Sequence, residues 1–262
     1  MGLDHHHLHE FAHDLMHARE SLTPIPPLTQ TAPEITADDA YHIAADIIGH
    51  LVEDGRRVIG KKVGLTSKPM QEALGIDTPD FGVLLDDMTV RDGGRVRRNT
   101  LIQPRVEPEI AFRLKSPLRG PGITAEQVLE ATEYVLPVLE IVDSRIEGWR
   151  IKEADTIADN GSSALVVLGS MRAPVNALDL KKEAVVLSHN GVEMYRGAGA
   201  AVLGNPAEAV AWCANKLAEF GAGIGAGEIV LPGSLTGAVE VQAGDTVSAE
   251  FASLGVVSVR FT

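Results

Sequence analysis

Short runs typical of β-strands alternate with glycine turns from Gln103 to the end of the chain, and this alternation restricts the fold more than any other feature. Two capped helical patterns interrupt it, over about Thr124–Tyr134 and Asn205–Phe220. Aromatic residues make up only 4% of the chain, whereas it has 26 glycines and 14 prolines, so many tight turns should surround an aliphatic core. The sequence therefore predicts a β-rich domain.

The chain before this region is predicted to begin with helices. Apolar residues recur at helical spacing over residues 8–18, and the proline-rich stretch 23–27 ends that helix. Thr36 is an N-cap signal with acidic residues after it, and the apolar stripe that follows ends near Gly55. We therefore expect two helices joined by a stiff connector.

Strands are expected to follow these helices. Arg57–Leu65 is rich in β-branched residues and predicts a strand, and Pro69–Gly75 predicts a short helix with proline first and glycine last. Three or four short strands are expected between Glu228 and Phe261. The predicted fold class is α+β: a helical segment with a Pro-rich connector over residues 1–56, and a rolled, mixed β-sheet domain over residues 57–262 that carries the candidate catalytic residues.

Charge and composition exclude several classes of protein. The chain has 23 basic and 36 acidic residues, and its net charge of −13 repels phosphate backbones and anionic lipids, so nucleic acid is not an expected partner. The sequence has no apolar run typical of a signal peptide or a membrane span. Its single cysteine, Cys213, lies in an apolar helical pattern where a buried thiol is usual. We expect a cytoplasmic protein without a membrane span.

Glu107 and Glu109 stand two residues apart in a strand-like segment. Both carboxylates should therefore leave the same face, while Val106, Pro108 and Ile110 point the other way. Two carboxylates this close are stabilised by a cation between them. The alternative is a solvated sheet face with two unrelated glutamates.

Glu140 stands in the apolar run Val135–Val142, whose side chains should be buried. An ionised carboxylate in such a run needs a partner, which is either the nearby Arg145 or a metal ion. Three carboxylates are ligands that Mg²⁺ or Mn²⁺ accepts, and no set of Cys and His suited to zinc accompanies them. Both partners stay open, and magnesium is the better choice of metal.

A series of motifs follows at consistent spacing from about residue 35 to the end of the chain. They are Gly60–Ser67 (GKKVGLTS), Pro79–Gly82 (PDFG), Gln103–Glu109 (QPRVEPE), Leu139–Arg145 (LEIVDSR), Asp155–Asn160 (DTIADN), Gly197–Pro206 (GAGAAVLGNP) and Ile229–Ser234 (IVLPGS). Together they resemble the 2-keto-4-pentenoate hydratase family, which belongs to the fumarylacetoacetate hydrolase-like superfamily. The resemblance implies a fold of fumarylacetoacetate hydrolase-like type.

The resemblance also implies roles for individual residues. It places Glu107, Glu109 and Glu140 at three metal-ligand positions for Mg²⁺ or Mn²⁺, and Lys62 at the lysine of the KVGLT motif. Lys62 is then a candidate for proton handling or for pairing with the anionic oxygens of the substrate, and Asp80 is a second acid–base candidate. A lysine in a dry pocket beside a cation can have a lowered pKa. Otherwise Lys62 is a surface lysine and Asp80 a turn residue.

Other residues have weaker assignments. Ser162 and Ser234 are candidates for binding the substrate carboxylate, or else serve in turns. Asp159 and Asn160 either support the site through hydrogen bonds or close a loop. Pro108 replaces the aliphatic residue of the family and predicts a strand edge or a bulge. The far wall of the pocket is expected to include Trp149.

The implied reaction adds water to 2-hydroxypenta-2,4-dienoate, or a close substituted analogue, to give 4-hydroxy-2-oxopentanoate in the meta-cleavage degradation of aromatic compounds. The substrate first ketonises by a proton shift to the far end of the diene, and water then adds to the enone, with the metal as Lewis acid. The alternative is decarboxylation of 4-oxalocrotonate (2-oxohex-3-enedioate), which uses the same triad and lysine. Relatives with that activity carry a nonpolar residue where Asp80 stands, which favours the hydratase.

The residues present disfavour two other functions. A carbon–carbon bond hydrolase uses a histidine paired with an acid, and no histidine occurs between residues 51 and 188. A non-catalytic partner subunit would be expected to have lost one of the acids or Lys62. By the resemblance we expect a homo-oligomer that associates with a sister enzyme of its pathway. His9, His13 and His17 would stack on one helix face, and we assign them no function.

Overall fold

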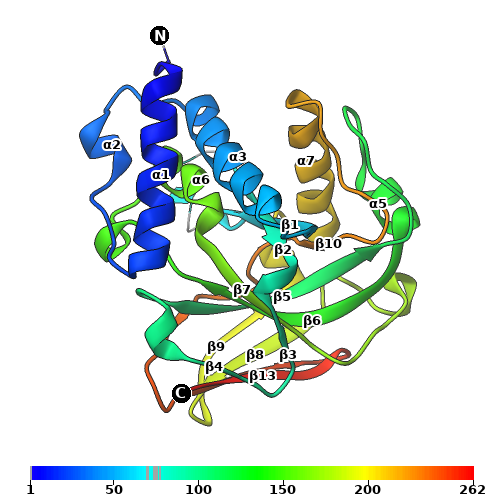
Figure 1. Ribbon diagram of the computed structural model, residues 1–262. Helices are drawn as coiled ribbons and strands as arrows, with labels where there is room; N and C mark the ends of the chain where they lie inside the picture. Colours follow the sequence, from blue (N-terminus) through cyan, green and yellow to red (C-terminus); the bar gives the residue numbers. More distant parts are fainter. Residues whose placement is uncertain (1, 69–70, 73–75, 77) are drawn as a thin grey trace.

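The computed structural model describes residues 2–68, 71–72, 76 and 78–262. In Figure 1 these residues form three layers, with helices above, a larger β-sheet in the middle and a smaller sheet below. N-terminal helices followed by mixed sheets confirm the predicted α+β class. The short helix predicted over Pro69–Gly75 falls largely outside the described residues.

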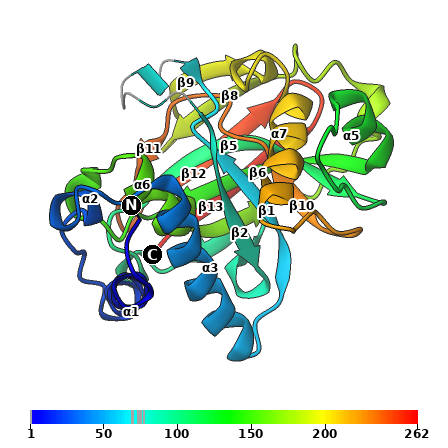
Figure 2. The same ribbon diagram turned by 90° about the horizontal axis from the view of Figure 1, so that it is seen from above.

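The described α-helices are α1 (His5–Ser21), α2 (Leu28–Thr31), α3 (Ala37–Glu53), α5 (Ala125–Ala131), α6 (Glu153–Ala158) and α7 (Pro206–Glu219). α1 begins at Asp4, whose side chain accepts a hydrogen bond from the amide of His7. α3 begins with a capping box between Thr36 and Asp39. These local signals explain why both N-terminal helices agree with the sequence-based prediction. Seen from above, α1 and α3 lie next to each other (Figure 2).

The larger sheet has the order β2-β1-β10-β5-β6-β7-β3, and β11 pairs with β5. Its strands are β1 (Val58–Gly64), β2 (Asp80–Leu85), β3 (Thr89–Arg91), β5 (Arg105–Leu114), β6 (Thr132–Val142), β7 (Ser163–Leu168), β10 (Ile229–Leu231) and β11 (Val239–Glu240). The smaller sheet has the order β4-β13-β12-β8-β9. Its strands are β4 (Gly94–Val96), β8 (Ala184–His189), β9 (Val192–Ala198), β12 (Thr246–Phe251) and β13 (Gly255–Phe261). Parallel and antiparallel pairs occur in both sheets, so both are mixed.

The two faces of the larger sheet meet different partners. Side chains such as Val106 and Ile141 face the smaller sheet and share a core with it. On the opposite face, residues such as Ala111 and Val138 share a core with α1, α3 and α6. The N-terminal helices therefore cover one face of the sheet, and the division of the chain after residue 56 stays a prediction.

One helix is shorter than the sequence pattern suggests. The helix predicted over Thr124–Tyr134 ends at Ala131, and Thr132 already begins β6. Thr132 pairs with Leu114 of β5, so long-range strand pairing overrides the local helical pattern there. Cys213 is buried in α7 as expected, and burial raises the pKa of its thiol to about 12. None of the described helices combines the length and the apolar character that a membrane crossing needs.

Candidate active site

Three acidic side chains meet on the helix-covered face of the larger sheet. Glu107 and Glu109 lie on β5, and the register of β5 with β6 puts Glu140 directly opposite Glu107. One carboxylate oxygen from each acid lies within 4.8 Å of the other two. Glu109 and Glu140 are buried, and Glu107 is partly buried. Side-chain alternation along β5 and its pairing with β6 thus bring the three acids to one point.

Several oxygens of this cluster have no hydrogen-bond partner among the described residues, namely Oε1 of Glu109 and both carboxylate oxygens of Glu140. Oε2 of Glu109 accepts a hydrogen bond of 2.7 Å from the amide of Gly233. A buried carboxylate oxygen without a hydrogen-bond partner is costly unless a positive charge lies beside it. Three converging carboxylates suit a hard divalent cation such as Mg²⁺ or Mn²⁺ and leave coordination positions for water or substrate. The residues therefore fit such a cation.

Burial and mutual repulsion disfavour the ionised form of the glutamates in this cluster. Burial and repulsion from Glu140 raise the pKa of Glu107 to about 7. Burial and repulsion from Glu140 and Glu107 also raise the pKa of Glu109 well above its ordinary value. A positive charge placed among these groups would therefore be bound favourably.

Lys62 supplies a positive charge next to the cluster. Its Nζ atom lies 3.6 Å from Oε2 of Glu140 and donates a hydrogen bond of 2.9 Å to the carbonyl of Gly161. Lys62 is buried, so it is not a surface lysine. Burial by itself lowers the pKa of Lys62, but nearby acids, with Glu140 first and Asp80 next, raise it overall. Without a metal ion the surrounding carboxylates therefore outweigh burial, and the lowered pKa that the sequence suggests for a lysine beside a cation stays a prediction.

Asp80 is a second buried acid–base candidate. It begins β2, where it pairs with Gly64 of β1, and its Oδ2 accepts a hydrogen bond of 3.2 Å from the hydroxyl of Thr156. A Cβ atom at Gly64 would lie 2.1 Å from Oδ1 of Asp80 and 3.3 Å from Nζ of Lys62, so glycine permits this close approach. Burial raises the pKa of Asp80 against the opposing effect of Lys62. Asp80 is thus buried beside Lys62 and is not an exposed turn residue.

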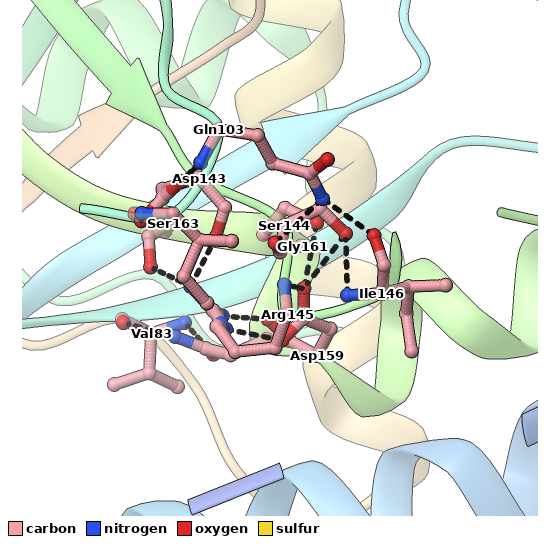
Figure 3. A network of polar contacts seen from close by, with 12 residues as sticks. Val83, Gln103, Asp143, Ser144, Arg145, Ile146, Asp159, Gly161 and Ser163 are labelled. Atoms are coloured by element: carbon pink, nitrogen blue, oxygen red, sulfur yellow. Dashed lines mark hydrogen bonds and ion pairs between the residues drawn. The ribbon is translucent and has the colours of Figure 1, made fainter. Parts of the chain in front are cut away.

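Arg145, the alternative partner of Glu140, is bound elsewhere (Figure 3). Its guanidinium group forms an ion pair with Asp159 and donates a hydrogen bond of 2.7 Å to the carbonyl of Asp143. Asp159 begins the short turn that presents the carbonyl of Gly161 to Lys62. The ion pair of Arg145 with Asp159 therefore holds the turn that contacts Lys62. The cationic neighbour of Glu140 is Lys62, not Arg145.

The two candidate serines lie in different surroundings. Ser162 lines the cavity beside the acids, and its hydroxyl donates a hydrogen bond of 2.9 Å to Asp159. Ser234 lines a neighbouring cavity, and its hydroxyl donates a hydrogen bond of 2.9 Å to the carbonyl of Thr236 within its own turn. The sequence did not point to Gly233, whose amide donates a hydrogen bond to Glu109. The backbone of Gly233 has a φ of +118°, a conformation that favours glycine. The PG turn of the IVLPGS motif was the signal that could have found it.

A cavity of about 170 Å³ opens beside the acids. Lys62, Asp80 and Glu107 line it, together with Trp149 and Arg105. The guanidinium carbon of Arg105 lies 4.6 Å from the centre of the Trp149 ring, so the two side chains form one wall. The cavity is smaller than the pockets of about 300–1,000 Å³ that hold drug-sized ligands, which suits a small organic acid.

Pro108 is tolerated because the neighbouring strand is interrupted beside it. On one side of β5, β10 pairs with Phe112 and Arg113, and β11 pairs with Arg105 and Val106. Between these two pairings, the carbonyl of Pro108 accepts a hydrogen bond of 3.0 Å from a loop amide. The proline nitrogen faces the same gap, so no ladder donor is lost. The predicted edge is therefore only local, because β5 itself lies inside the sheet between β10 and β6.

Known proteins resemble this chain over nearly its whole length. It is 48% identical over 250 residues to a 2-hydroxyhexa-2,4-dienoate hydratase of Comamonas testosteroni, and the alignment covers 95% of each chain. It is 43% identical over 252 residues to a 2-keto-4-pentenoate hydratase of Paraburkholderia xenovorans, and this alignment covers 96% of this chain and 94% of the relative. The structure of 4-oxalocrotonate decarboxylase from Pseudomonas putida G7, complexed with magnesium and adipate, superimposes with a TM-score of 0.97 at 38% identity over 99% of each chain.

A family model gives the same result for most of the chain. The model described as fumarylacetoacetate (FAA) hydrolase C-terminal matches residues 57–262. This range contains the three acids, Lys62, Asp80 and both sheets. The chain belongs to the fumarylacetoacetate hydrolase family.

Proposed function

We propose that this chain is a hydratase, dependent on Mg²⁺ or Mn²⁺, that adds water to 2-hydroxypenta-2,4-dienoate or a close substituted analogue. The product is 4-hydroxy-2-oxopentanoate, in the meta-cleavage degradation of aromatic compounds. The observation that carries the proposal is the buried cluster of Glu107, Glu109 and Glu140, which adjoins the cavity lined by Lys62 and Asp80. The hydratase relatives support the type of reaction.

Each group has a part in this reaction. Glu107, Glu109 and Glu140 would hold the metal ion, which would supply Lewis acidity towards the substrate. Lys62, whose Nζ atom lies beside Glu140 and whose side chain lines the cavity, is placed to pair with the anionic oxygens of the substrate. Asp80, whose pKa burial raises, is suited to give and take protons.

Two proton transfers account for the atoms of the reaction. The 2-hydroxyl group loses its proton and C5 gains one, which converts the dienol into the 2-oxo-3-enoate. Water then adds its hydroxyl group to C4, and C3 gains a proton. Oδ1 of Asp80 has no hydrogen-bond partner among the described residues, so we assign to it the proton exchange with water.

Decarboxylation of 4-oxalocrotonate is the alternative, favoured by the structural similarity to 4-oxalocrotonate decarboxylase. Both reactions pass through an enolate of the substrate. Only hydration needs a base that takes a proton from water, so a buried carboxyl group at Asp80 supports the hydratase.

An ultraviolet assay tests the proposal. Chelator-treated protein is mixed with 2-hydroxypenta-2,4-dienoate with and without Mg²⁺, and the product is identified by mass. Loss of the diene that depends on Mg²⁺, with the gain of one water, would support the hydratase. No turnover of this substrate, together with release of carbon dioxide from 4-oxalocrotonate, would transfer the assignment to the decarboxylase.

We also propose that the protein works in the cytoplasm as a homo-oligomer and associates with a sister enzyme of its pathway. The family resemblance supports the assembly, and the single buried cysteine is compatible with a reducing compartment. Light scattering on the purified protein gives its mass, and a monomer at micromolar concentration would contradict the homo-oligomer.

A further inference from the structure

All nine histidines except His189 lie on α1 and α3, the two adjacent helices above the larger sheet (Figures 1 and 2). The sequence shows His9, His13 and His17 only as one face of a single helix, and this face alone suggests no ligand set. The fold adds partners from α3, because the packing of α1 against α3 places Asp46 and His50 beside His9.

These three side chains form a compact group across the helix pair. Nδ1 of His9 lies 2.7 Å from Oδ2 of Asp46, and Nε2 of His50 lies 3.6 Å from Oδ1 of the same carboxylate. One donor atom from each residue lies within 4.8 Å of the other two. Asp46 thus stands between two imidazoles that come from different helices.

The backbone holds two of the three donors in register. Asp46 and His50 are four residues apart on α3, so they project from adjacent turns of the same face. The third donor, His9, is held by the packing of α1 on α3, where Leu8, Ala12 and Ile43 are buried. The group is therefore assembled before any ion binds, which lowers the entropic cost of binding.

The donor set differs in kind from the three glutamates of the sheet. Two imidazole nitrogens and one carboxylate oxygen suit Zn²⁺, Ni²⁺ or Cu²⁺, whereas Mg²⁺ prefers oxygen ligands. Tetrahedral zinc with bonds of about 2.0–2.1 Å places its donor atoms roughly 3.3 Å apart. The separations of 2.7 and 3.6 Å run to different oxygens of Asp46, so small side-chain rotations would be needed to bring one donor atom of each residue to this spacing.

The site is accessible to ions from solution. The side chains of His9, Asp46 and His50 are 67%, 26% and 49% exposed. An ion can therefore enter without unfolding of the helices, and water can complete its coordination. We propose that these three residues bind one transition-metal ion of the Zn²⁺ type and that this ion clamps α1 onto α3.

Calorimetric titration with Zn²⁺ tests the proposal on the full-length, chelator-treated protein. Saturating Mg²⁺ is kept present so that the glutamate cluster does not compete for zinc. The parent protein should bind one zinc ion in its tightest binding step. Replacing one ligand, as in His50→Gln or Asp46→Asn, should weaken this step at least about tenfold. The matched control His17→Gln, an exposed histidine on α1 outside the group, should leave it unchanged.

Thermal unfolding supplies a second readout. Zinc should raise the unfolding temperature of the parent and of His17→Gln, and the increase should disappear in His50→Gln, because ligand binding to the folded state stabilises it. Zinc binding that is equally tight in His50→Gln and in the parent would overturn the proposal and place the ion on the α1 histidines alone. Absence of zinc binding by the parent would overturn it as well.

Discussion

Glu140→Gln separates metal binding from folding, because it removes one negative charge at nearly constant volume. Without metal, Glu140 has one attractive neighbour, Nζ of Lys62 at 3.6 Å, which corresponds to about 4.6 kcal/mol at an effective dielectric constant of about 20. Glu107 and Glu109 lie within 4.8 Å, and each repels an ionised Glu140 by about 3.5 kcal/mol or more at the same dielectric constant. The two repulsions together exceed the attraction by at least about 2 kcal/mol when all groups are charged.

Proton uptake by Glu107 and Glu109 removes this repulsion, since both pKa values are raised, and the attraction to Lys62 then dominates. We therefore expect the metal-free variant to unfold at a lower temperature than the parent near neutral pH. Its response to Mg²⁺ should differ. At a concentration of about 100 times the parent Kd, binding stabilises the parent by about 2.7 kcal/mol. A variant that binds about 100-fold more weakly gains only about 0.4 kcal/mol at that concentration.

Thermal unfolding followed by circular dichroism, with and without Mg²⁺, measures both effects. For a chain of this size the parent should gain about 5–10 °C and Glu140→Gln about 1 °C. Glu133→Gln is the matched control, because Glu133 is an exposed acid on the same strand β6. A variant that gains as much from Mg²⁺ as the parent would refute metal binding by Glu140. A metal-free variant that unfolds at or above the temperature of the parent would refute the balance of charges.

Three further perturbations test neighbouring parts of the site. The first perturbation is Glu107→Gln in the metal-free protein, where the free energy of unfolding of parent and variant is measured in urea. The difference, parent minus variant, should fall as the pH rises from 4.5 to about 7, because the folded state holds the proton of Glu107 more tightly than the unfolded state in this range. A rise in this difference would contradict the raised pKa. Lys62→Met should lower turnover at least about 100-fold. The same variant should bind Mg²⁺ more tightly, because a positive charge beside the acids is lost, and calorimetry showing weaker binding would be inconsistent with this electrostatic reasoning. Trp149→Ala should raise the ratio of kcat/KM for a dienoate with a longer substituent to kcat/KM for the unsubstituted substrate about tenfold. If steady-state kinetics show that this ratio is unchanged, Trp149 does not face the substrate.

Much of the secondary structure was predictable because its signals are local. The cap at Thr36 starts α3, the Asn205–Pro206 signal starts α7, and the spacing of two residues between Glu107 and Glu109 places both acids on one face of β5. These features depend on neighbouring residues only, so the sequence is sufficient to predict them. The early end of α5 was not predicted, because the residues from Thr132 onward pair with β5, which is distant in the sequence.

The assembly of the site depended on contacts that no local pattern contains. The register of β5 with β6 puts Glu140 opposite Glu107, and the order of the sheet lets Lys62 reach Glu140 although two strands separate β1 from β6. The same holds for Arg145, which the sequence offered as a partner of Glu140 and which the fold pairs with Asp159.

The sequence by itself determined the helical N-terminal segment, most strands and the spacing of the candidate site residues, because periodicity and capping act between near neighbours. Tertiary structure alone decided which charges became neighbours, in the glutamate cluster as well as between His9 on α1 and Asp46 on α3. The physical reason is that register and helix packing are set by burial of apolar side chains over the whole chain, and charged groups then take the neighbours that this packing imposes.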